Sequence, residues 1–314
     1  MRAGFKVGDK YFPFPVFAVF SILVFILIAY FNQAIRLLTF PFPVEYGEGV
    51  VANYIIRVMN GQSVYPDFSA DNFIFLHNPY GPLFFYASAF FAKFFSNPFL
   101  SGRLLSLLSF FLIIIFLYLS QSRGFRCQRS RCGFSGIEWL SDLILERKSF
   151  MGFIFALAFF AGSPIVWRYS VMSRVDFFAL AITAYSFYFL HLSERKNNDH
   201  VQRRELFLLF ISGVLSGSAF LVKPLYLISA FSGIFVTMNS SFKRFAIFAS
   251  GIITVMAIFF CWLFISDSYV ALLVHWTKLN LIGVSFAQFA KLFFLFLRNH
   301  PFCFLYFFIS LYKF

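Results

Sequence analysis

Two carboxylates that lie three residues apart open the most polar stretch of an otherwise apolar chain. Glu45 and Glu48 belong to the run 41–49, which directly follows a long apolar segment. Desolvation near lipid raises the proton affinity of a carboxylate and a nearby cation lowers it, so such a group can act as a general base or as a metal ligand. The structural alternative for Glu48 is that it starts a helix expected at about 50–60, where an acidic residue near the N-terminus is favourable.

A third carboxylate and two cations stand further along the chain. Arg174 and Asp176 have opposite charges, are two residues apart and lie where a strongly apolar segment resumes. A structural ion pair and a functional pair are both open. Lys223 is followed by Pro224, which divides the apolar stretch 206–238 into two helices. An ammonium group at such a break attracts lipid phosphates.

A histidine and a tyrosine complete the set of polar candidates. His77 and Tyr80 lie in a proline-rich segment that leads into the apolar run at 80–96. An imidazole in this place can contact a phosphate or an acceptor, and the alternative is a histidine that is simply solvated.

The composition of the chain indicates whether it folds in water or in a membrane. Of the 314 residues, 60% are hydrophobic and 12% are charged, and the mean hydropathy is +0.79. A water-soluble core cannot hide so much apolar surface, and several uncharged runs reach the length of about 18 to 20 residues that a spanning helix needs. The chain is therefore predicted to be an all-α, polytopic transmembrane helical bundle.

Nine apolar segments are candidates for crossing the membrane. They are 14–40, 80–96, 103–120, 150–167, 177–192, 206–222, 225–238, 245–265 and 301–312. Short basic loops stay cytoplasmic, and the two most basic loops are 121–149 and 193–205. With the N-terminus inside, both are cytoplasmic only if the segment 80–96 does not cross. Its uncharged part is also too short to span, so we expect an interfacial helix there and about eight spanning helices.

This topology makes 41–99 one long exterior loop that carries interfacial helices. It also places 168–176 in a short exterior turn and Lys223 at an exterior helix end, so that the polar candidates gather at one face. The first apolar run follows basic residues and has no cleavage site, which is typical of a signal anchor. We expect an integral plasma (inner) membrane protein with a cytoplasmic N-terminus.

The charge and the cysteines argue against two other kinds of partner. The formal net charge is +13, but Lys and Arg fall in short loops and form no basic face for a nucleic acid. Of the four cysteines, Cys127 and Cys132 share one loop without a second pair of zinc ligands nearby.

In their order and spacing, these residues resemble the GT-C superfamily of membrane glycosyltransferases, particularly the family 39 or aminoarabinose-transferase-like branch. The first exterior loop of that family carries an Asp-Glu motif, which Glu48 matches, while Gly47 stands where the family has Asp. The other matched segments are Asn60 to Tyr65, His77 to Tyr86, Gly102 to Ser106 with Arg103, Ser163 with Pro164, Arg174 to Asp176, and Lys223. The similarity covers residues from about 45 to 225.

The resemblance implies transfer of a sugar from a polyprenyl-phosphate donor to a lipid, glycan or protein acceptor at the non-cytoplasmic face. Glu48 or Glu45 then acts as base toward the acceptor hydroxyl, and Asp176 assists. A divalent ion, Mg²⁺ or Mn²⁺, is the cofactor that this chemistry admits, with Glu48 and Asp176 as its ligands. Cations at the site neutralise the phosphate leaving group. The residues predicted to bind substrate are Arg174, Lys223, His77, Tyr80 and Arg103.

Two rival functions remain open. A multi-pass transporter suits the helices and the proline-broken segment, but transporters tend to place ionisable groups near the bilayer midplane. A non-catalytic membrane subunit is the other rival, and it is favoured if Gly47 or a shortened C-terminus means lost activity. We expect 1–314 to form a single transmembrane domain that lacks the C-terminal part of longer relatives.

Overall fold

The computed structural model describes residues 4–7, 10–66, 78–95, 97–129, 157, 160, 163–193, 203–266, 268–273 and 275. Most of these residues are helical, which confirms the predicted all-α class. A short antiparallel hairpin of β1 (Gly4–Val7) and β2 (Lys10–Pro13) precedes the first helix and was not predicted.

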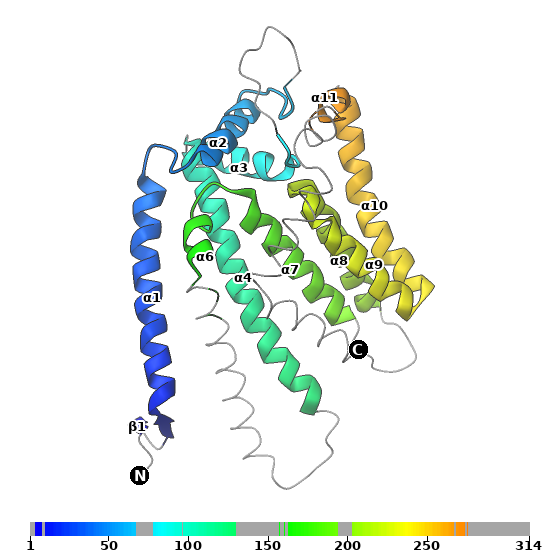
Figure 1. The fold of residues 1–314 in the computed structure, drawn as a ribbon. Helices are drawn as coiled ribbons and strands as arrows, with labels where there is room; N and C mark the ends of the chain where they lie inside the picture. Colours follow the sequence, from blue (N-terminus) through cyan, green and yellow to red (C-terminus); the bar gives the residue numbers. More distant parts are fainter. Residues whose placement is uncertain are drawn as a thin grey trace, which may run out of the picture. The chain divides into compact units, whose positions relative to one another are not determined.

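Figure 1 labels the helices and colours them in their order along the chain. They are α1 (Phe14–Thr39), α2 (Tyr46–Met59), α3 (Leu83–Phe95), α4 (Pro98–Arg129), α6 (Pro164–Tyr169), α7 (Val175–Ser193), α8 (Arg203–Val222), the 3₁₀ turn η1 (Pro224–Tyr226), α9 (Leu227–Ser240), α10 (Phe242–Ile265) and α11 (Tyr269–Leu273). Proline opens α4, α6 and η1, because the first helical position does not need the N–H that proline lacks.

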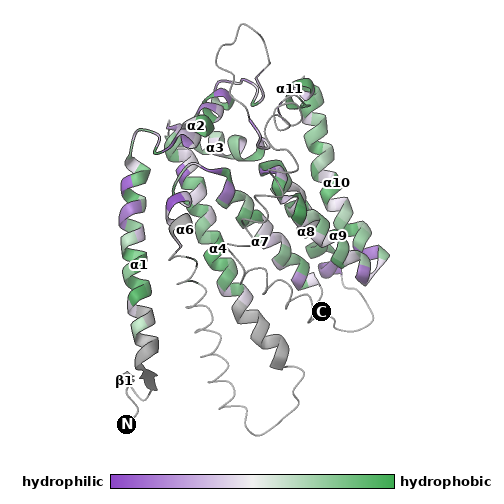
Figure 2. Ribbon diagram, in the orientation of Figure 1, coloured by the Kyte–Doolittle hydropathy of each residue, from purple (hydrophilic) through white to green (hydrophobic). Residues whose placement is uncertain are grey.

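Five of the described helices are long and apolar enough to cross a membrane, so the chain is a polytopic membrane protein. The five stretches are Ser21–Thr39, Pro98–Ser120, Val175–Ser193, Arg203–Val222 and Phe242–Ile265. Figure 2 shows apolar residues along most of these helices and polar residues in α2 and at the turn between α6 and α7. Of the other predicted spans, 301–312 lies outside the described residues and 150–167 lies mostly outside them.

Two apolar segments form helices that are shorter than a span. The segment 225–238 becomes η1 and α9, and the 14 residues of α9 extend about 21 Å, against a hydrocarbon core of about 30 Å. The segment 80–96 becomes α3, whose 13 residues reach about 20 Å, and its place at the membrane interface stays a prediction.

Small residues bring the spanning helices close together. The hydroxyl of Ser186 in α7 lies 2.8 Å from that of Ser216 in α8. Gly213 and Gly217 face α10 instead, and a Cβ at 213 would lie 2.1 Å from the carbonyl oxygen of Phe248. In a membrane, where lipid is as apolar as the side chains, such close backbone approach is a main source of helix association.

The turn between α6 and α7 is held by a buried aromatic cluster. The hydroxyl groups of Tyr30 in α1 and Ser170 in the turn lie 2.8 Å apart. Tyr30 also packs with Phe110 of α4 and Phe177 of α7 in one buried core. The turn therefore has a fixed place against three spanning helices.

The chain divides into two compact units. The first comprises Met1–Val64 and Tyr80–Leu263, and it contains nearly all of the five spanning stretches. The second comprises Tyr65–Pro79 and Phe264–Phe314. In the second unit the buried ring of His275 accepts a hydrogen bond from the backbone N–H of Asn78 at 3.1 Å.

Candidate functional site

Seven of the eight predicted site residues lie at one end of the first unit, and the eighth, His77, lies outside the described residues. They come from the α1–α2 connection, the first turn of α2, the segment before α3, the start of α4, the α6–α7 turn, the first turn of α7 and the break after α8. We call the following set the polar cluster: Glu45, Glu48, Tyr80, Arg103, Arg168, Arg174, Asp176 and Lys223.

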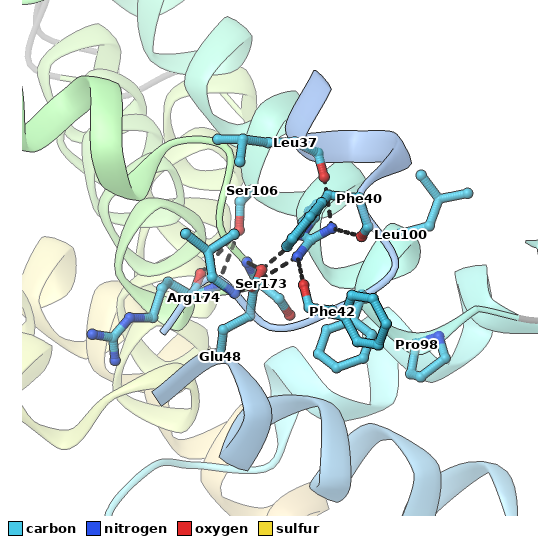
Figure 3. Close-up of polar contacts among 12 residues, drawn as sticks. Leu37, Phe40, Phe42, Glu48, Pro98, Leu100, Ser106, Ser173 and Arg174 are labelled. Carbon is cyan, nitrogen blue, oxygen red and sulfur yellow. Dashed lines mark hydrogen bonds and ion pairs between the residues drawn. The ribbon is translucent and has the colours of Figure 1, made fainter. Parts of the chain in front are cut away.

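Arg103 and Glu48 form a fully buried ion pair, with both side chains at 0% exposure. The guanidinium donates to both carboxylate oxygens, at 2.8 and 2.9 Å. It also donates to the carbonyl oxygens of Leu37, Phe40 and Phe42, at 2.6, 2.5 and 2.8 Å. Figure 3 shows these three carbonyls directed at one guanidinium. All five N–H groups of Arg103 are thus donated to the protein.

Both carboxylate oxygens of Glu48 also accept hydrogen bonds from within the protein. Besides the two bonds from Arg103, the carboxylate accepts the backbone N–H of Ser173 at 2.9 Å and that of Val44 at 2.8 Å. Burial by itself raises the pKa of Glu48, but the hydrogen bonds from Arg103, Ser173 and Val44 outweigh burial and hold the pKa below its ordinary value. Glu48 is therefore a charged group that joins α2, α4 and the α6–α7 turn.

Local sequence explains why this pair can form. The helix starts at Tyr46 and not at about residue 50 as predicted, so Glu48 lies in the first turn, where its side chain can bond back to the residues before the helix. Gly102 precedes Arg103 and lets the α6–α7 turn approach α4. A Cβ at 102 would lie 1.8 Å from the Oγ atom of Ser173.

Glu45 lies at the accessible edge of the cluster with two guanidinium groups. Its side chain is 15% exposed and contacts Arg174 at 2.5 Å and Arg168 at 3.3 Å. Arg174 is 20% exposed and Arg168 is 59% exposed. Both guanidiniums also lie over the ring of Tyr169, at 5.3 and 5.7 Å from its centroid.

The glycine that departs from the family motif is part of this arrangement. A Cβ at Gly47 would lie 2.6 Å from the Nη1 atom of Arg174, so the guanidinium occupies the space that a side chain at 47 would take. Figure 3 shows the side chain of Arg174 directed away from the buried pair that includes Glu48. Gly47 therefore allows Arg174 to reach Glu45.

A second ion pair lies at the break after α8. The Nζ atom of Lys223 is 2.5 Å from a carboxylate oxygen of Asp176, and the side chains are 26% and 37% exposed. The ammonium also lies 5.8 Å from the ring centroid of Tyr80. Gly81 places this ring, because its N–H donates to the carbonyl oxygen of Val222 at 3.1 Å.

The predicted metal ligands do not fit a divalent cation as they are placed. The carboxylate oxygens of Glu48 already accept hydrogen bonds from N–H groups, and Asp176 is paired with the ammonium group of Lys223. Among the described residues, no three His, Cys, Asp or Glu side chains form a group that could hold a metal ion.

Arg168 and Ser173 lie in the predicted exterior turn 168–176, but neither of them was predicted to have a role in the site. Arg168 was visible as a further cation in the same short turn, six residues before Arg174. The contribution of Ser173 comes from its backbone N–H, which no residue type in the sequence could indicate.

The arrangement offers one accessible carboxylate flanked by two guanidiniums, beside a half-exposed pair of a carboxylate and an ammonium. Such groups can bind an anion and accept a proton at the same edge.

Comparisons of this chain with protein-family models, with curated proteins and with solved structures find no match.

Proposed function

We propose that this chain is a membrane glycosyltransferase that moves a sugar from a polyprenyl-phosphate donor to an acceptor at the non-cytoplasmic face. The observation that carries the proposal is the polar cluster, in which carboxylates and cations from positions 45 to 223 meet at one end of a set of spanning helices. The order of these residues along the chain, which resembles that of GT-C enzymes, is the second support.

Within this proposal the base is Glu45 and not Glu48. A base must have a lone pair that can receive the proton of the acceptor hydroxyl. The oxygens of Glu48 already accept four hydrogen bonds from Arg103, Ser173 and Val44. Glu45 is partly exposed, and its partners among the described residues are the two guanidiniums. Glu48 and Arg103 then act as positioning residues.

When the donor phosphate binds, it replaces Glu45 as the partner of the two guanidiniums. It binds Arg174 and Arg168, whose guanidiniums match phosphate in geometry and charge, and so releases Glu45. The acceptor oxygen attacks the anomeric carbon and passes its proton to Glu45, while the bond between that carbon and the phosphate oxygen breaks. The electron pair leaves with polyprenyl phosphate, whose added negative charge the guanidiniums and Lys223 stabilise.

The location of the ion pairs favours this chemistry over transport. Transporters place binding groups near the bilayer midplane, usually where helices are discontinuous. The ion pairs of the described residues lie instead at helix ends and in connections, as with Asp176 in the first turn of α7 and Lys223 just after α8.

The test is sugar transfer by the full-length chain in membranes, with a panel of labelled polyprenyl-phosphate sugars. We expect the wild type to transfer one of these sugars, and Glu45→Gln and Asp176→Asn to lose most of the activity while they keep the wild-type thermal stability. Glu205→Gln is the matched control, because it removes one carboxylate from the first turn of α8, at the other end of that helix.

Unchanged transfer in both Glu45→Gln and Asp176→Asn would refute the assignment of the site. A wild-type chain that transfers none of the sugars would favour the non-catalytic membrane subunit.

A further inference from the structure

Residues 40–46, which are the connection between α1 and α2 and the first residue of α2, expose apolar side chains along their whole length. Phe40 is 44% exposed, Phe42 65%, Val44 39% and Tyr46 84%. These residues alternate with Pro41, Pro43 and Glu45, so every second side chain of the connection is large and apolar.

Part of the backbone of the same connection is bonded within the protein. Pro41 and Pro43 have no N–H to satisfy. The carbonyl oxygens of Phe40 and Phe42 accept hydrogen bonds from Arg103. The N–H of Phe40 donates to Leu37, and that of Val44 donates to the carboxylate of Glu48.

The exposed apolar side chains are unfavourable in water, and the internal hydrogen bonds of the backbone suit a place in lipid. Exposed apolar area is unfavourable in water by about 25 cal/mol per Å². At membrane depth, backbone polar groups find no water and must be satisfied inside the protein. The carbonyl groups of Phe40 and Phe42, which face the buried guanidinium of Arg103, meet that requirement, while the rings of the same two residues are exposed.

The position of the connection indicates that lipid covers these exposed apolar side chains. It begins one residue after the spanning stretch Ser21–Thr39, where the chain leaves the hydrocarbon layer. Aromatic side chains gather at that boundary because their rings suit the level of the headgroups.

We propose that residues 40–46 insert into the boundary between the headgroups and the acyl chains of the bilayer leaflet at which α1 ends. The partner is the phospholipid bilayer itself. Arg103 and Glu48 favour the insertion, because they bond the carbonyl groups of Phe40 and Phe42 and the N–H of Val44, which would otherwise need water. Glu45, in the same connection, then lies at the level of the lipid headgroups. This inference concerns a lipid surface and does not depend on sugar transfer.

The test measures depth in the membrane with spin labels on the full-length chain in phospholipid vesicles. Single cysteines replace Phe42 or Tyr46 in a chain whose native cysteines, Cys127, Cys132, Cys261 and Cys303, are changed to Ser. Collision rates with oxygen, which partitions into lipid, and with a water-soluble nickel complex give the depth of each label. Ile22→Cys, in the spanning part of α1, and Gln62→Cys, after α2, are the lipid and water references.

We expect the labels at 42 and 46 to lie about 5 to 10 Å below the phosphates, between the two references. Labels at both positions that collide with the nickel complex as often as the label at Gln62 would overturn the proposal. Both side chains are largely exposed, so their replacement leaves the packing of the protein intact.

Discussion

At the scale of single residues, Glu45 and Glu48 are chemically identical and three positions apart, yet their surroundings differ completely. Glu48 is buried against Arg103 and accepts four hydrogen bonds. Glu45 lies 15% exposed between two arginines that solvent reaches. The difference arises because α2 begins between them, and its first turn points Glu48 inward.

Loss of the Glu48 charge should destabilise the fold. In Glu48→Gln the guanidinium of Arg103 stays buried without a counter-charge, which costs about 3 to 5 kcal/mol. We expect the variant to unfold at a clearly lower temperature in lipid nanodiscs, as measured by intrinsic fluorescence. Glu45→Gln, at a partly exposed pair, should shift the unfolding temperature far less. Equal shifts in the two variants would contradict the structural role of Glu48.

The same pair should make stability depend on acid pH. The pKa of Glu48 lies below its ordinary value of 4.5 in the folded chain. Its stabilising effect is therefore complete above pH 4.5 and is lost as the pH falls through the lowered pKa. We expect wild-type stability to drop below pH 4.5, and Glu48→Gln to show a smaller drop over the same interval. Parallel pH profiles would show that Glu48 does not provide this stability.

At the scale of the elements, the close approach between α4 and the α6–α7 turn brings the site together. The approach needs a residue without a Cβ at position 102, where one would overlap the side chain of Ser173. Ser173 in turn donates its backbone N–H to Glu48, so this contact links the packing of α4 to the buried ion pair.

A pair of compensating substitutions should test the contact between Gly102 and Ser173. Gly102→Ala should destabilise the chain by about 1 to 3 kcal/mol, because the new methyl group overpacks the contact. Adding Ser173→Gly removes both atoms that a Cβ at 102 would strike, and the nearest remaining atom is the Cδ1 of Ile55 at 3.3 Å. We expect the double variant to recover part of the thermal stability.

Gly49→Ala is the matched control, because a Cβ there meets nothing closer than Pro43 at 3.7 Å. A double variant that is no more stable than Gly102→Ala alone would show that Ser173 is not the group that position 102 accommodates.

At the scale of the whole molecule, the direction of the helices determines which residues share a side of the membrane. α8 and α10 run parallel, because Gly213 faces Phe248 and Gly217 faces Val255 further along both helices. Since α8 ends beside Lys223 in the polar cluster, the start of α10 lies at the opposite end of the first unit.

Membrane-impermeant maleimides should report this arrangement on single-cysteine chains. Gln62→Cys, after α2, should react in intact cells, and Phe242→Cys, at the 80% exposed start of α10, should react only after permeabilisation. The expected outcome combines the helix directions with the predicted cytoplasmic N-terminus. Reaction of both cysteines from the same side would exclude this arrangement of α8 and α10.

The sequence by itself determined the solvent and the class of the fold. Hydrophobic runs of about 20 residues predict membrane helices because no other secondary structure of that length satisfies its own backbone in lipid. The runs at α1, α4, α7, α8 and α10 were accordingly predicted and confirmed. Charge bias in the loops also predicted that the candidate residues share one face of the membrane. In the structure seven of them lie at one end of the first unit, and the membrane face stays a prediction.

Only the tertiary structure decided how those residues pair. The partner of Glu48 is 55 positions away in Arg103, and its further donor, the N–H of Ser173, is 125 positions away. Such pairs depend on close approach in three dimensions. Gly102 has no Cβ to collide with the side chain of Ser173, and Gly47 has none to collide with the guanidinium of Arg174. The strength of a buried hydrogen bond also depends on geometry and on the exclusion of water, and neither can be read from residue types in order along a chain.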